Sequence, residues 1–258
     1  RILLLSFAVV FCICNLQVFS QGCVAIKNMP CTALPGFENG ATSDSVISNS
    51  PQWEISLNSR YFKSYKHFVG SKEQKQRVEQ GTEVINKVYS FDIGIIHNFK
   101  KRYIASLIVP VIFNYRSSLY EHYGNSTTAN PQRQRFSTGA NGIGDMRLTV
   151  SSWILDPKKK RRGNVALGLG LKLPTGNAEV LDDFHRRKSN GEDSVVRKAV
   201  DQSIQLGDGG FGFSIEAQGY QRLFKNAALF YSGFYLFNPR NTNNNFRGGN
   251  NPVTRYNS

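Results

Sequence analysis

The feature that most constrains this chain is an alternation of residue types over residues 164–176, which read NVALGLGLKLPTG. Neighbouring side chains of a β-strand point to opposite faces, so alternate residues meet different surroundings. One set is aliphatic and the other is small or charged: Val165, Leu167, Leu169, Leu171 and Leu173 against Ala166, Gly168, Gly170 and Lys172. Such a strand separates an apolar environment from a crowded or watery one.

The same two-residue period returns along most of the chain, and we expect each repeat to be a strand. The further runs are residues 53–61, 89–95, 103–115, 146–150, 211–217 and 227–238. Their connections alternate between short links and long polar stretches, the latter at residues 63–83, 117–138 and 174–210. Short turns at one end and long loops at the other are typical of an outer-membrane barrel.

The third run also has the length and ends of a membrane-crossing strand. Tyr103 and Tyr115 stand at the two ends of one apolar face, where amphipathic rings suit both membrane interfaces. Pro110 lies in the middle of this run and cannot donate to a neighbouring strand, so we expect a β-bulge there. Trp153 has the inward parity of its own run, which predicts either a second bulge or a tryptophan packed inside.

These patterns predict an all-β fold: an antiparallel, up-and-down transmembrane β-barrel. Seven runs are an odd number, and the chain ends in a polar stretch without a closing aromatic strand. We therefore expect a C-terminally truncated fragment, with a partial barrel over residues 51–258 and a periplasmic N-terminal segment over residues 21–50. The alternative is a secreted soluble β-sandwich.

Residues 1–20 have the composition of a secretory signal peptide: one basic residue, an apolar run, then small and polar residues. A membrane-spanning helix is the alternative for this segment. The remaining cysteines, Cys23 and Cys31, are predicted to form one small disulfide loop in an oxidising compartment. Metal binding by this pair is less favoured, because no histidine lies nearby.

A family resemblance appears in residues 142–176, which open with Gly142, Gly144 and Asp145 and close with Lys-Leu-Pro-Thr-Gly at residues 172–176. This stretch, with DQSIQLGDGGFGF at residues 201–213, resembles the outer-membrane β-barrel transporters of the MetA-pathway of phenol degradation type. The likeness covers residues 140–237. It implies an outer-membrane channel or transporter for small solutes, aromatic or hydrophobic compounds among them.

The net charge of +14 at first suggests a nucleic-acid partner. The basic residues are scattered over turns and loops, however, while the aromatic residues lie on the apolar parity, so no basic surface with stacking rings is expected. The four histidines, His67, His97, His122 and His185, fall in predicted loops or at strand ends without a convincing serine or carboxylate partner. We expect no enzymatic activity, no cofactor and no metal site. The acidic residues within 182–208 match no calcium loop and indicate a mobile surface loop.

Polar residues on the inward parity are the candidate site. They are Glu54, Arg60, Asp92, Asp145, Arg147, Lys172, Glu216 and Gln218. One interpretation is that they line a polar passage and set its charge preference. The other is that they form an internal ion-pair network, since Asp145, Arg147 and Lys172 are expected on adjacent strands. The expected function is passive diffusion of small solutes across the outer membrane. A plugged structural or docking barrel, whose outer loops bind a partner, is the alternative.

Overall fold

The computed structural model describes residues 52–100, 102–157, 159, 162–224, 227–239, 242–246 and 252–254. The predicted signal peptide, the segment over residues 21–50 and the Cys23–Cys31 pair lie outside the described residues.

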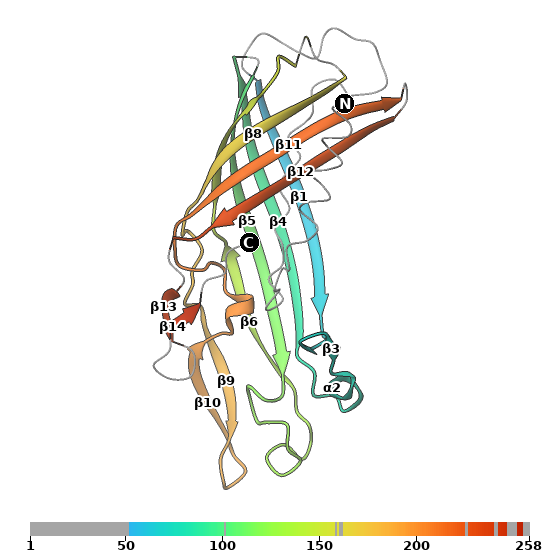
Figure 1. Cartoon of the computed structure of the whole chain (residues 1–258). Helices are drawn as coiled ribbons and strands as arrows, with labels where there is room; N and C mark the ends of the chain where they lie inside the picture. The colour runs from blue at the N-terminus through green and yellow to red at the C-terminus, as the bar shows by residue number, and fades with distance from the viewer. Residues whose placement is uncertain are drawn as a thin grey trace.

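A single large antiparallel sheet dominates the described chain and curls into a half-barrel (Figure 1). Its strands are β1 (Gln52–Ser64), β4 (Ile85–Phe99), β5 (Tyr103–Ser118), β6 (Phe136–Ile143), β7 (Arg147–Trp153), β8 (Gly163–Lys172), β11 (Gly212–Phe224) and β12 (Ala227–Phe237). They pair in the order β1-β4-β5-β7-β8-β11-β12, and β6 also pairs with β5. The predicted all-β, antiparallel fold is confirmed, and all seven predicted runs lie in this sheet.

Smaller elements lie in the long connections, which gather at one end of the sheet (Figure 1), and in the chain after β12. They are β2 (Phe68–Val69), β3 (Lys72–Glu73), α2 (Lys75–Glu79), β9 (Leu181–Arg187), β10 (Asp193–Ala199), the short 3-10 helix η1 (Gln202–Ile204), β13 (Thr242–Phe246) and β14 (Pro252–Thr254). Two predictions were wrong here. Residues 174–210 are not a loop without regular structure, because β9 and β10 pair as a hairpin and η1 follows it. Strand β6 begins before the end of the loop predicted over residues 117–138.

The two faces of the sheet have opposite polarity. On the outer face, Ile55 and Leu169 keep 78% and 70% of their surface exposed. On the other face, Asp92 and Glu216 keep only 9% and 6%. Burial follows this alternation closely along β4, where almost every second residue from Asn86 onward is buried. A water-soluble sheet protein buries its apolar face. This half-barrel buries its polar face instead.

Strand β5 changes partner in the middle, at Pro110. Its second half pairs with β6 as far as Val111↔Ile143, and its first half pairs with β7 from Ile108↔Arg147. Between these two pairs there is one more residue on the β6–β7 side (144–146) than on β5 (109–110). The Gly144 amide donates to the Pro110 carbonyl at 2.8 Å. This break is the bulge that the sequence predicts at Pro110.

An apolar cluster fills the concave face near the short-turn end. It consists of Ile96, Ile104, Trp153, Ala166 and Tyr220, one residue from each of five strands. These five strands are consecutive in the sheet, and Trp153 keeps only 3% of its surface exposed. Trp153 therefore packs inside, in edge-to-face contact with Tyr220 at 5.8 Å between ring centroids.

Candidate functional site

The structure places the predicted inward residues unevenly. Six of them are buried: Asp92, Asp145, Arg147, Lys172, Glu216 and Gln218. The other two, Glu54 and Arg60, are half-buried on β1, where they pair with Ile96 and Ser90 of β4. Directly paired residues of an antiparallel sheet project to the same side, so these two share the face of the buried set.

A charged group occupies the middle of the concave face. Arg147 on β7 lies between the carboxylates of Glu216 and Asp92, both of which act on its charge. Its guanidinium also lies 5.1 Å from the ring centroid of Phe234 on β12. Glu216 accepts hydrogen bonds at Oε1 from Thr149 at 3.0 Å and from Ser214 at 2.9 Å. Asp92 Oδ1 is buried without a hydrogen-bond partner among the described residues.

A second group centres on Asp145, in the break between β6 and β7. Its Oδ1 accepts from the Gly176 amide at 3.0 Å, and its Oδ2 accepts from the Asp208 amide at 3.1 Å. Lys172 Nζ lies 3.4 Å from the same Oδ2 and also pairs with Asp208. The interpretation of an ion-pair network thus holds for Asp145 and Lys172, whereas Arg147 interacts with other carboxylates.

The three stretches that carry the family resemblance meet around this carboxylate. Thr175 Oγ1 donates to the Gly144 carbonyl and accepts from the Met146 amide, each at 2.9 Å. A Cβ on Gly176 would lie 2.5 Å from the Leu206 carbonyl oxygen, and a Cβ on Gly207 would lie 2.4 Å from Asp145 Oδ1. Only glycine fits at these two close approaches.

The chain between β8 and β11 then returns along the concave face of β5. Asn114 on β5 donates through Nδ2 to the Ile204 carbonyl at 2.8 Å. An apolar cluster joins the two surfaces and includes Ile112, Ala140, Val200, Ile204 and Leu206. Because Ile112 and Asn114 alternate with the exposed Phe113, η1 lies on the inner side of the sheet.

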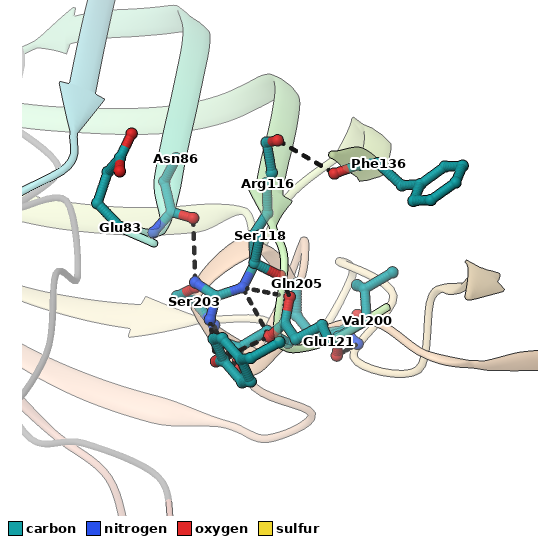
Figure 2. Close-up of polar contacts among 12 residues, drawn as sticks. Glu83, Asn86, Arg116, Ser118, Glu121, Phe136, Val200, Ser203 and Gln205 are labelled. Atoms are coloured by element: carbon teal, nitrogen blue, oxygen red, sulfur yellow. Dashed lines mark hydrogen bonds and ion pairs between the residues drawn. The ribbon is translucent and has the colours of Figure 1, made fainter. Parts of the chain in front are cut away.

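Arg116 adds polar interactions to the contact between η1 and the inner face of the sheet, as Figure 2 shows. Its Nη1 donates to Asn86 Oδ1 at 3.1 Å and to Ser203 Oγ at 3.3 Å, and its Nε donates to Glu121 at 3.0 Å. Asp201 pairs with Nη2 at 3.5 Å. One buried guanidinium thus joins β4, the loop after β5 and η1. The inward positions predicted from the sequence do not include Arg116, although it has the same parity as Asn114 on the third run.

A histidine cluster joins the β9–β10 hairpin to the loop after β5. The buried His122 ring stacks on Phe184 and accepts from the His185 amide at 3.1 Å. Burial is the main cause that lowers the pKa of His122 to about 4. His185 Nδ1 lies 2.7 Å from Asp193 Oδ2, so the expectation that no histidine has a carboxylate partner was wrong. Strand pairing brings these two residues together across the hairpin.

Two further properties concern only the described residues. No group of three or more histidine, cysteine, aspartate or glutamate side chains is arranged there to hold a metal ion. None of the helices in that part of the chain is both long and apolar enough to cross a membrane.

Comparisons with known proteins find no matching family model and no matching curated relative. The resemblance of residues 140–237 to the outer-membrane transporters therefore stays a prediction.

Proposed function

We propose that this protein is an outer-membrane β-barrel channel that passes small solutes by diffusion. The observation that carries the proposal is the inverted polarity of the sheet. Leu169, Ile55 and Ile215 are exposed on the outer face, while Arg147, Glu216 and Asp92 are buried on the concave face. In water, the exposed aliphatic face would favour association. In a bilayer it contacts lipid, and the concave face encloses the polar groups.

The resemblance to outer-membrane transporters and the alternation of short turns with long loops support the same function. The resemblance also suggests aromatic or hydrophobic compounds as solutes. The predicted signal peptide, export to the outer membrane and membership of the transporter family belong to this proposal.

The test is electrical and needs the full-length protein in a planar lipid bilayer. Stepwise conductance, together with swelling of liposomes in small sugars, is the expected result. Membrane fractionation should place the protein with the outer membrane. A correctly inserted barrel without conductance or solute flux would reject the channel, and recovery in the soluble periplasm would favour the secreted β-sandwich.

The filled concave face favours a second candidate, a plugged barrel that serves as a structural or docking component. The Trp153 cluster closes the inner side near the short-turn end, and η1 covers it near the long-loop end. In this case the outer loops would bind a partner. Pull-down from intact outer membranes separates the candidates: a stable stoichiometric partner together with a silent bilayer supports docking, whereas conductance without a partner supports the channel.

A further inference from the structure

We infer that the connection between β8 and β11, residues 173–211, forms the constriction of the proposed channel. We infer further that the Asp145 carboxylate holds this connection inside the barrel. This inference rests on the proposed function, because it assigns the part of the chain that controls the width of the passage.

The connection is far longer than its topology requires. Lys172, where β8 ends, is directly paired with Gly212, where β11 begins. Adjacent antiparallel strands can be joined by a two-residue turn. A connection as long as residues 173–211 is therefore not needed to join β8 to β11. We infer that this folded connection has another role.

Part of this connection lies against the inner wall. Ile204 is fully buried against Ile112 and Ala140, and its carbonyl accepts from Asn114. These wall residues belong to β5 and β6, which are separated from β8 and β11 by β7. The segment therefore crosses the concave face from the strands that carry it to other strands of the sheet. In a closed barrel, chain that crosses the interior reduces the open cross-section.

The root of the segment is fixed by Asp145. Its carboxylate accepts two backbone amides of the connection, those of Gly176 on the outgoing side and Asp208 on the returning side. Lys172 balances the negative charge from the same side. A buried carboxylate needs such partners to remain ionised. One side chain of the wall thus holds both ends of the crossing segment.

The part of the segment around η1 is fixed by Arg116. Asp201, which precedes η1, and Ser203 within η1 contact its guanidinium, while Asn86 and Glu121 contact it from the wall and the following loop. Besides its root, the segment is thus attached through the apolar contact of Ile204, through the charged contact of Arg116 and through the β9–β10 hairpin, which contacts His122 and whose Asp182 accepts from the Gly139 amide at 2.7 Å. An element with several separate buried attachments is held in one position rather than sampling the lumen freely.

Two substitutions release the segment in different ways. Ile204→Asp places a charge in the apolar contact without changing the wall, and Asp145→Ala removes the acceptor of both root amides. Asp183→Asn is the matched control, because Asp183 lies exposed on the hairpin of the same connection and pairs only at the surface with Arg197. Resistance of the folded barrel to SDS at room temperature verifies that each full-length variant is folded.

Both releasing variants should raise the single-channel conductance by roughly twofold, because conductance follows the open cross-section. They should also admit larger sugars in the liposome assay, while Asp183→Asn matches the wild type. A wild type that conducts, with folded Ile204→Asp and Asp145→Ala variants of unchanged conductance and size limit, would overturn the constriction and leave the channel standing. A silent wild type that opens in both variants would support the constriction and reject diffusion in the resting state. Silence of all proteins would overturn both.

Discussion

Asp145 and Arg116 are buried charged side chains, and each is held by groups from several parts of the chain. Asp145 accepts from two backbone amides and lies beside Lys172. Arg116 donates to side chains of three different segments. Burying an ionised group is costly unless hydrogen bonds and opposite charges replace water. Removing one partner of such a group typically costs about 3–5 kcal/mol, so both residues favour a single arrangement of the connections.

His122 predicts a pH dependence of the β9–β10 hairpin. We call the hairpin docked when it contacts His122 of the loop after β5. The pKa of His122 in this docked state is about 4, against 6.5 in the absence of burial. The undocked state therefore binds more protons between these values. Docking is fully stable above about pH 6.5 and weakens as the pH falls toward 4. The mobility of a spin label on the exposed hairpin tip, at Ser189→Cys, should rise over this window.

The control for this prediction is His122→Phe, which keeps a ring between Phe184 and Phe136 but cannot be protonated. Its spin label should show no such rise. Nearby Glu121, Arg186, Lys198 and His185 also act on the charge of His122. If the phenylalanine variant keeps the full pH response, those neighbours, not His122, govern docking.

At the scale of the elements, the period-two pattern predicts the strands whose outer face must be apolar. It fails for β6, which reads FSTGANGI and carries glycine, serine and asparagine where an aliphatic stripe would be expected. It also fails for β9 and β10, which lie outside the main sheet and have no apolar face to present. The Asp145 site was only half predictable. Its inward direction follows from parity, but its amide partners lie 31 and 63 residues further along the chain.

The outer face of β8 gives a direct test of lipid contact. Leu169→Arg should lower the free energy of unfolding in phospholipid vesicles by about 2–4 kcal/mol, the cost of a cationic side chain at the bilayer midplane. Leu169 and Val195 are both exposed aliphatic residues, but Val195 lies on the β9–β10 hairpin outside the main sheet. Val195→Arg should therefore change stability little. Equal effects in a denaturant titration would mean that the face of Leu169 does not contact lipid.

The described part of the chain shows three zones along its concave face. The apolar cluster of Trp153 lies near the short turns, the charged group of Arg147 lies in the middle, and η1 lies toward the long connections. A solute that crosses the proposed channel would meet all three. The middle zone carries charges of both signs. The balance between its positive and negative charges should set the ion preference of the passage.

Neutralising one sign in that zone should shift the selectivity in a defined direction. Arg147→Gln should favour cations and Glu216→Gln should favour anions, each by about two- to fivefold in the permeability ratio, since a charge a few ångströms away contributes on the order of 1 kcal/mol in water. Reversal potentials in a KCl gradient measure this ratio. Lys188→Gln, on the exposed hairpin, is the control. Equal reversal potentials in all variants would show that permeating ions do not pass the middle zone.

The break opposite Pro110 has a consequence for the direction of every side chain around it. Even-numbered residues of β6, such as Thr138 and Ala140, face inward, whereas odd-numbered residues of β7, such as Arg147 and Thr149, do so. The additional residue inverts the phase of the alternation between the two strands. Without it, β7 would turn Leu148 and Val150 inward and Arg147 and Thr149 toward the surroundings. A single inserted position thus keeps two sequence patterns of opposite phase on one continuous wall.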